Sequence, residues 1–261
     1  MTMLVQYQDK LQKLLTTTPM PMDRFLEFLC KSETTFCDTS LELELLIDSG
    51  FALDILDDMV YYRPTITDIA DQQFCIVDIE CSDSIKNGGQ IIEIGVIKYK
   101  NSKTIDHFES LVYCSSVSTH IHRITGIDTD MLYTAPPLSQ VLKQFVEFLG
   151  DAVFVAHDVK FDYKFINHSL AKEGLQTIAN TTLCTIDLSK RIINTEKYGL
   201  RHLKDFLGIN ISDHHRACSD ASSAKDIFEI CLKFLPQNIK TVSQLIEFSK
   251  SSDIKNSLSH K

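Results

Sequence analysis

The sequence predicts an α/β fold in which a mixed five-stranded sheet is flanked by helices, with a small module of helices and a hairpin before it. Three apolar strand patterns follow one another through short connections, which is the arrangement of an antiparallel meander. Helix and strand patterns then alternate, which favours strands added to the same sheet. A separate block before the meander has helical spacing followed by two short strand patterns.

The first block, residues 1–70, has the pattern of a unit of its own. Met22–Ser32 has apolar residues at helical spacing, and Leu41–Ser49 is expected to form a second helix, although its Leu/Glu alternation also fits a strand. Phe51–Arg63 has the pattern of a hairpin. Helices followed by a hairpin suggest a winged-helix-like module. The preferred interpretation is a helical cap packed on the main domain, because such shapes host many functions.

The main domain is expected over residues 71–236, followed by a tail over residues 237–261 with one amphipathic segment, Val242–Lys250. The strand patterns are Phe74–Glu80, Ile91–Tyr99, Thr104–Tyr113, Ala152–Ala156 and Thr182–Thr185. The helix patterns are Pro137–Leu149, Val159–Glu173, Ile186–Ile193, Leu200–Leu207 and Ala217–Phe234. A three-stranded meander followed by alternating helices and strands is the order of the ribonuclease H-like fold.

The composition is that of an ordinary globular protein, with 44% hydrophobic and 23% charged residues among 261. Because there is neither a bilayer-length apolar run nor a signal segment, we expect a soluble, cytoplasmic protein without a membrane partner. The eight cysteines include no CxxC pair, and several stand in apolar runs. They are therefore expected to be buried free thiols in a reducing compartment.

The net charge of −9 argues against a tight, sequence-reading DNA binder that works by broad phosphate neutralisation. The second predicted helix is itself acidic through Glu42, Glu44 and Asp48, which argues against DNA binding there. The charge is compatible with an enzyme whose local positive charge comes from bound metal ions. Such an enzyme would bind nucleic acid weakly alone and would depend on a partner to hold it there.

Two carboxylates stand at the end of the first main-domain strand. Asp78 and Glu80 are two residues apart, so both point to the same face of the strand. Unpaired carboxylates on a central apolar strand are costly, whereas hard divalent cations take oxygen ligands. A solvated strand end is the alternative, and the pair alone is weak evidence for a metal site.

Further candidate residues stand at the beginnings of two helices. Asp162 lies in the first turn after the Ala152–Ala156 strand, where the helix dipole favours an ionised carboxylate, and Asp158 is the better N-cap candidate. His215 lies on the loop before the last helix, and Asp220 lies in its first turns. A neutral imidazole can accept a proton from metal-bound water near neutral pH. A lone His or Asp at such places more often caps a helix.

Together, the blocks FCIVDIECS, FVAHDVKFDYKFI and HHRACSDASSAKDI resemble the motifs of DEDDh 3′→5′ exonucleases. Within that family they are most similar to the epsilon-type proofreading exonuclease of bacterial DNA polymerase III. The resemblance covers Gln73 to Pro236 and leaves out the N-terminal block. Further similar stretches are Gln90–Gly95, Ile124–Leu132 and Gly199–Gly208. One departure follows the first motif, where Cys81, Ser82 and Asp83 replace the usual Thr and Gly beside the terminal nucleotide.

The resemblance implies hydrolysis of the last phosphodiester at a single-stranded or frayed 3′ end of DNA, with release of nucleoside monophosphates. Two divalent ions, Mg²⁺ or Mn²⁺, would lie about 4 Å apart. Asp78, Glu80 and Asp220 would hold one ion, and Asp78 would bridge to the second, which Asp162 supports. His215 would deprotonate the attacking water.

The family motifs also choose between neighbouring candidates. The spacing from the last acid selects His215 rather than His214 as the base. The second motif commonly has Asn where this chain has Asp158, so Asp162 is the expected ligand and Asp158 the expected cap.

Two alternatives and two partners stay open. An exoribonuclease of the same family would use the same residues, and a non-catalytic scaffold would be expected to lack one of them. The DNA polymerase III catalytic subunit is one candidate partner. The other is a sliding clamp, because Gln244–Phe248 resembles a clamp-binding peptide, although Glu247 stands where an apolar residue is usual. The same segment also fits the apolar side of a docking helix.

Overall fold

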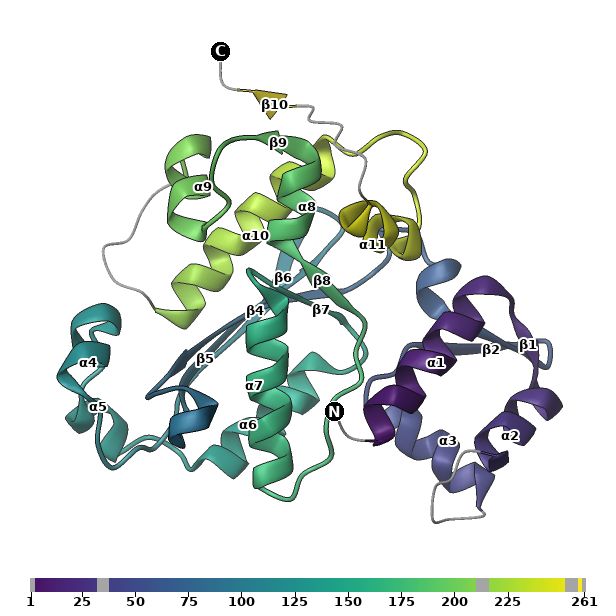
Figure 1. The fold of residues 1–261 in the computed structure, drawn as a ribbon, viewed down its shortest axis with the longest axis horizontal. Coiled ribbons are helices and arrows are strands. Elements are labelled where there is room, and N and C mark those ends of the chain that lie inside the picture. The colour runs from purple at the N-terminus through teal and green to yellow at the C-terminus, as the bar shows by residue number, and fades with distance from the viewer. Residues whose placement is uncertain (1–2, 32–37, 210–215, 252–257, 260–261) are drawn as a thin grey trace.

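The computed structural model describes residues 3–31, 38–209, 216–251 and 258–259. Its main sheet has the strand order β6-β5-β4-β7-β8 (Figure 1). The strands are β4 Phe74–Cys81, β5 Ile91–Lys100, β6 Lys103–Leu111, β7 Val153–Ala156 and β8 Thr182–Cys184. β4, β5 and β6 pair antiparallel, whereas β7 and β8 join the sheet in parallel. The predicted mixed five-stranded sheet is therefore confirmed.

The meander depends on a tight turn between β5 and β6. Asn101 and Ser102 have φ values of +48° and +59°. Two successive residues in the left-handed region form the hairpin turn whose twist matches that of the flanking strands. The register that follows pairs Asp78 of β4 with Gly95 of β5.

Helices cover both faces of the sheet, and the alternation of side chains along β4 divides the core between them. Phe74 and Ile76 pack with α8 Thr185–Ile192, α9 Leu200–Leu207, α10 Ala217–Lys233 and α11 Val242–Lys250. Cys75, Val77 and Ile79 pack with α6 Leu138–Leu149 and α7 Val159–Lys172 on the other face. Because strand side chains alternate, the row of Phe74 and Ile76 continues at residues 78 and 80.

The N-terminal module contains α1 Met3–Thr17, β1 Met20–Pro21, α2 Met22–Lys31, α3 Thr39–Asp48, β2 Leu53–Leu56 and β3 Met59–Tyr62. Its sheet has the order β1-β3-β2, and the succession of helices and strands is that of a winged helix. Leu41–Ser49, which also fitted a strand, belongs to a helix. The sequence analysis did not predict α1 or β1.

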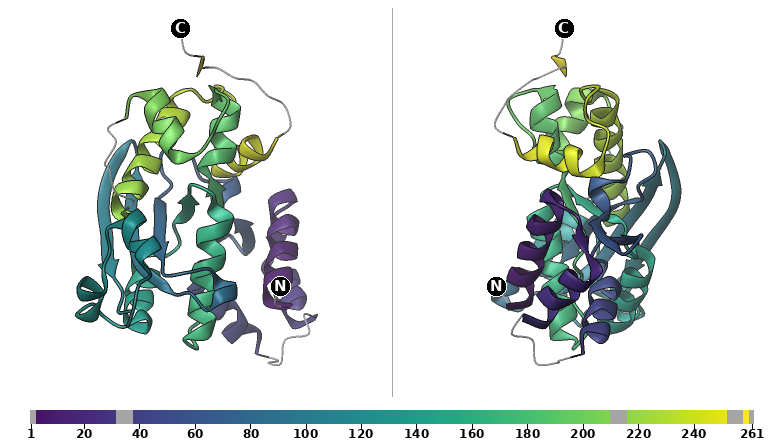
Figure 2. Two further views of the ribbon diagram at one scale, coloured as in Figure 1. Left: turned by 60° about the vertical axis from the view of Figure 1, so that its left-hand side comes forward. Right: turned by 90° about the vertical axis from the view of Figure 1, so that its right-hand side faces the viewer.

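The module lies beside the main domain in Figure 1 and in the left view of Figure 2. The Tyr62 and Thr181 hydroxyls share a 2.6 Å hydrogen bond, and the Ala179 N–H donates to the Ser49 carbonyl. Gln176 donates to the carbonyl of Leu45 on α3, the helix that would read DNA in a winged helix. The packing agrees with a cap on the main domain.

Gln244–Phe248 belongs to α11, and Thr241 and Gln244 form a capping box at the beginning of this helix. Leu245 is fully buried and Ile246 is 7% exposed, both in the core that contains α10. The structure therefore supports the docking-helix interpretation, because a clamp-binding peptide has to present these apolar side chains.

The remaining elements are short and lie outside the main sheet. The 3-10 turns are η1 Arg63–Thr65 and η2 Ile85–Asn87, and β9 Ile193–Asn194 pairs with β10 Leu258–Ser259. α4 Thr119–Thr125 and α5 Thr129–Tyr133, which the sequence analysis did not predict, pack around Ile92 and Ile127. Among the described residues, no helix has the length and hydropathy of a membrane span. The described cysteines are free, and Cys75, Cys114 and Cys231 are buried.

Candidate active site

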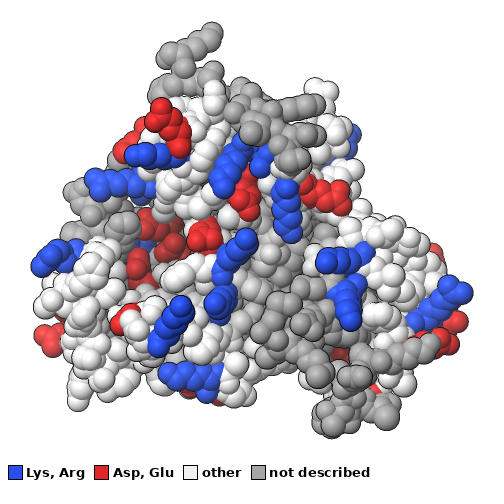
Figure 3. Space-filling model, viewed as in Figure 1, with Lys and Arg blue, Asp and Glu red and all other residues white. Residues whose placement is uncertain are grey.

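The acids of the first motif lie where β4 passes from the core to the surface. Asp78 and Glu80 follow Phe74 and Ile76 on the strand face that α10 covers. The apolar residues fix this strand in the centre of the sheet, so the two carboxylates are held by a rigid element. Figure 3 shows acidic side chains gathered in a recess of the surface, with lysine and arginine side chains around it.

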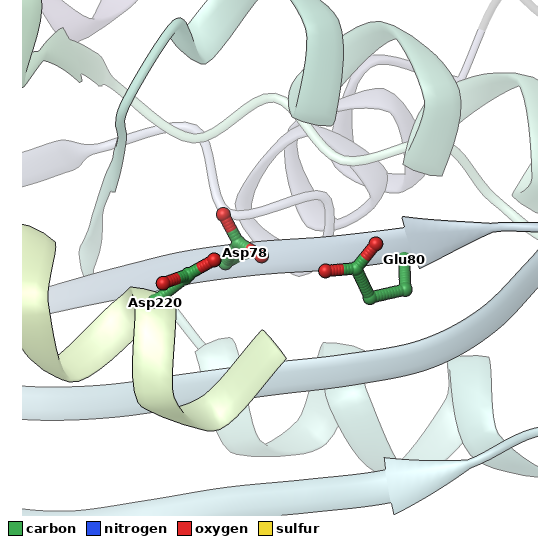
Figure 4. A group of neighbouring side chains, drawn as sticks. All are labelled: Asp78, Glu80 and Asp220. Atoms are coloured by element: carbon green, nitrogen blue, oxygen red, sulfur yellow. The ribbon is translucent and has the colours of Figure 1, made fainter. Parts of the chain in front are cut away.

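Asp220 comes to the same place from the first turn of α10. Asp78, Glu80 and Asp220 each offer one carboxylate oxygen, and these oxygens lie within 4.8 Å of one another. Figure 4 shows the three carboxylates converging, two from the strand and one from the helix. Oxygen-only ligands at this spacing fit a hard divalent cation such as Mg²⁺ or Mn²⁺.

The beginning of α10 is fixed to β5 by Glu93, a fully buried acid. Its carboxylate accepts hydrogen bonds from Arg216 Nη2 at 2.6 Å, from Arg216 Nε at 2.9 Å and from the Ala217 N–H at 2.9 Å. Gly95 allows the close approach, since a Cβ there would lie 2.2 Å from the backbone nitrogen of Cys218. These contacts place the helix turn that presents Asp220.

Asp162 is buried in the first turn of α7, with 4% exposure. Burial raises its pKa to about 8, although backbone hydrogen bonds lower it. The sequence analysis expected the helix dipole to favour the ionised form of this acid, and the backbone hydrogen bonds do so, but desolvation has the larger effect on the pKa. Asp162 is also the largest charged contributor to the raised pKa of Asp78, so the two acids are neighbours.

Asp158 stands at the N-cap position of α7 but does not cap it through its side chain. Its φ of +78° puts the backbone in the left-handed region, which Asn and Asp adopt more readily than most residues. The expected side-chain cap is therefore wrong, and the position needs a residue that tolerates this conformation.

The pKa values of the acids on β4 are raised. Burial and the neighbouring acids raise the pKa of Asp78 well above its ordinary value. Burial, followed by Asp220 and Glu93, raises the pKa of Glu80 to about 7. Ionising Asp78, Glu80 and Asp162 together is therefore costly unless positive charge offsets burial and repulsion. The donor set therefore fits divalent ions, with Asp162 on the Asp78 side of the group.

The fifth candidate residue, His215, lies outside the described residues. A second imidazole, His157, is near the site, but both of its ring nitrogens have partners. Nδ1 lies 2.8 Å from the Thr185 hydroxyl and Nε2 lies 2.9 Å from the Tyr198 carbonyl. Burial lowers its pKa. His157 therefore ties β7 to α8 and to the loop before α9, and it is not a free base.

The chain departs from the family pattern in a compact loop beside Glu80. Asp83 accepts hydrogen bonds from the Ser84 N–H and from the Asn87 side chain. Gly89 packs on this turn, since a Cβ there would lie 2.0 Å from the Asp83 carbonyl oxygen. Asp83 stabilises its own loop in this arrangement.

Sequence reasoning missed two residues at this site, Glu93 and Lys204. Glu93 stands in the QIIEIG stretch, whose resemblance to the family was noted without a role for the acid. Its position in an otherwise apolar buried strand was the available signal. Lys204 on α9 is 4% exposed and lies beside Asp220. It stands in the Gly199–Gly208 stretch, whose resemblance to the family was noted without a role for the lysine.

Comparison with known proteins gives one family and one group of relatives. Residues 75–228 match the model of the RNase_T family, described as exonuclease. The chain is 39% identical over 176 residues to a DNA polymerase III PolC-type from Caldanaerobacter subterraneus, covering 66% of this chain and 12% of the relative. It is 34% identical over 221 residues to a PolC-type polymerase from Staphylococcus haemolyticus, covering 83% of this chain and 14% of the relative. The chain thus spans a small part of the length of these relatives.

Solved structures with the same fold include exonuclease X in complex with 5′ overhanging duplex DNA. Its TM-score is 0.52 at 22% identity, over 67% of this chain and 99% of that one. The nuclease domain of 3′hExo, a DEDDh family member bound to rAMP, has a TM-score of 0.57 at 18% identity, over 64% of this chain and 94% of that one. At these identities the likeness shows the fold.

Proposed function

The chain belongs to the RNase_T exonuclease family, and from this we propose that it removes nucleotides one at a time from the 3′ end of DNA in a two-metal reaction. The observation that carries the proposal is the convergence of Asp78, Glu80 and Asp220, with oxygens within 4.8 Å of one another, beside the buried Asp162. The order of these acids along the chain agrees with the family motifs.

The proposed reaction divides the work between the acids and the base. Asp78, Glu80 and Asp220 would hold one divalent ion, and Asp78 and Asp162 would hold the second. The bound ions would supply positive charge to the attacking and leaving oxygens. His215 would take the proton of the attacking water, as the family motif implies, and a nucleoside monophosphate would leave.

The polymerase relatives favour DNA as the substrate and proofreading as the role. In this proposal the nuclease domain is residues 71–236. Residues 1–70 form the N-terminal module and residues 237–261 form the C-terminal tail. Association with a polymerase III catalytic subunit, as an epsilon-type subunit or an equivalent, is part of the proposal, because an acidic protein needs help to hold DNA. An exoribonuclease would use the same site.

The test is cleavage of matched 5′-labelled DNA and RNA oligonucleotides by the purified chain, with Mg²⁺, with Mn²⁺ and with chelator. A ladder that shortens from the 3′ end, is stronger on DNA and needs metal supports the proposal. A stronger ladder on RNA indicates that the enzyme is an exoribonuclease with a role in RNA turnover. The absence of a ladder on both, even with a polymerase III catalytic subunit added, contradicts the catalytic proposal and favours the scaffold.

A further inference from the structure

A lysine ammonium lies beside the carboxylate that α10 contributes to the site. Lys204 is on α9, and its Nζ is 3.8 Å from Asp220 Oδ1. Lys204 is 4% exposed and Asp220 is 7% exposed. Because both groups are inside the protein, salt screens their interaction much less than it screens a surface ion pair.

The surroundings of Lys204 make a purely structural role a poor explanation. Its helix neighbour Leu203 is fully buried, and Leu200 and Leu207 pack partly buried against the same core. Taking an ammonium group out of water is strongly unfavourable unless an opposite charge compensates it. An apolar residue would fill this place at lower cost, so the charge itself needs an explanation.

A second cation near the site, Arg216, is engaged differently. Arg216 donates to Glu93 and lies 3.8 Å from Glu109, so its guanidinium is held by acids outside the group of proposed ligands. The ion pair of Lys204 among the described residues is with Asp220, a proposed metal ligand. The charge of Lys204 therefore lies directly beside a proposed metal ligand.

An ion held by Asp78, Glu80 and Asp220 would have to share Asp220 with this ammonium group. Like charges separated by a few ångströms repel strongly where the surroundings are protein rather than water. Lys204 thus has two opposite effects. It keeps positive charge beside Asp220 when metal is absent, and it lowers the affinity of the site for the ion that Asp220 binds.

We propose that Lys204 is a positioning residue that acts as a counter-ion for Asp220. Its charge keeps the affinity of the site for a divalent ion low, so that the ion exchanges readily. The inference rests on the proposed metal site and goes beyond it, since none of the family motifs quoted above assigns a role to this lysine. It predicts a metal affinity that rises when the charge is removed.

The test is isothermal titration of the purified full chain with Mn²⁺, comparing the native protein with Lys204→Met and Lys204→Gln. Both variants are expected to bind Mn²⁺ more tightly by about threefold or more, because the repulsion is lost. The rise in melting temperature on adding Mn²⁺ should grow correspondingly. Unchanged or weaker Mn²⁺ binding in the variants would overturn the proposal. If Lys204→Met does not fold, Lys204→Gln decides.

Two controls make the result specific. Lys190→Met removes a lysine with a similar partner distance, 3.7 Å to Asp187, but an exposed one, and its Mn²⁺ affinity should equal that of the native protein. Lys204→Arg keeps the charge and should also bind Mn²⁺ as the native protein does. If tight binding appears in Lys190→Met as well, net charge rather than position is responsible, and the proposal fails.

The failure of this inference can be told apart from the failure of the proposed function. Asp78→Asn is the reference variant, because it removes a ligand charge without touching Lys204. If Asp78→Asn abolishes Mn²⁺ binding and cleavage while the lysine variants bind as the native protein does, only the role of Lys204 is lost. If Asp78→Asn leaves cleavage intact, the metal site itself is wrong.

Discussion

Glu93 and Arg216 join β5 to the beginning of α10 through a charged pair whose Glu93 Oε1 to Arg216 Nη2 distance is 2.6 Å. The glutamate side chain is fully buried, whereas the arginine side chain is 34% exposed. Glu93 also accepts from the Ala217 N–H, so one carboxylate satisfies a helix-terminal donor and a guanidinium. The pair places the turn from which Asp220 reaches the acids of β4.

Replacement of Glu93 by Gln should therefore damage both stability and catalysis. The amide would present a donor where two donors now point, and leaving such groups unpaired costs about 1–3 kcal/mol. Urea unfolding should show this loss. The kcat should fall by about tenfold or more with KM little changed, because Asp220 is displaced.

The matched control is Glu109→Gln. Glu109 lies 3.8 Å from the same arginine, but its side chain is 45% exposed. A surface pair of this kind contributes less than about 1 kcal/mol. If the two variants lose stability equally, Glu93 has no special part in placing α10.

Gly95→Ala should disturb the site by displacing the beginning of α10. The added methyl group would lie 2.2–2.5 Å from backbone atoms of Ala217 and Cys218, so α10 has to move. Overpacking of this kind costs about 1–3 kcal/mol. Thermal denaturation and cleavage rates should both show the effect. Gly199→Ala is the control, because the structure leaves space at Gly199, and this variant should lose less stability and activity than Gly95→Ala although Gly199 is the N-cap of α9.

The stability of the metal-free protein should fall as the pH rises. The folded-state pKa values of Glu80 and Asp162 are raised to about 7 and about 8. Their unfolded values are about 4, so the folded state binds more protons between these limits. Stability is then greatest below the unfolded values and is lost as pH rises through the folded ones.

Thermal denaturation in chelator at about pH 5.5 and about pH 8 checks this dependence. Mn²⁺ should stabilise the protein more at the higher pH, where the carboxylates give up their protons to the ion. Glu80→Gln should reduce the pH dependence. A metal-free melting temperature that rises across this range in the native protein, and equally in Glu80→Gln, would contradict the assignment.

The sequence was sufficient for the elements that have strong periodicity. β4 and α9 were predicted from apolar patterns, and α11 was predicted from its amphipathic segment. α4 and α5 were missed because each is short and is stabilised at its beginning by a capping residue, Ser118 for α4 and Asp128 for α5. The spacing of apolar residues does not reveal helices this short.

The residues of the site could be predicted only where they belong to a motif with a known role. The convergence of Asp78, Glu80 and Asp220 followed from a resemblance, and the geometry agrees with it. The contact of Glu93 with Arg216 joins residues 123 positions apart, and only the fold brings them together. The burial that raises the pKa of Asp162 could not be read from its place at a helix beginning.

The most direct test of the central claim is 3′-end cleavage of 5′-labelled DNA by the native chain and by Asp78→Asn, each with Mg²⁺, with Mn²⁺ and with chelator. Asp78 is shared by both proposed ions, so its neutral isostere should lower the metal-dependent rate by about a thousandfold or more, which corresponds to about 4 kcal/mol. Circular dichroism should show that the variant folds. Near-normal, metal-dependent shortening by Asp78→Asn would contradict the two-metal account.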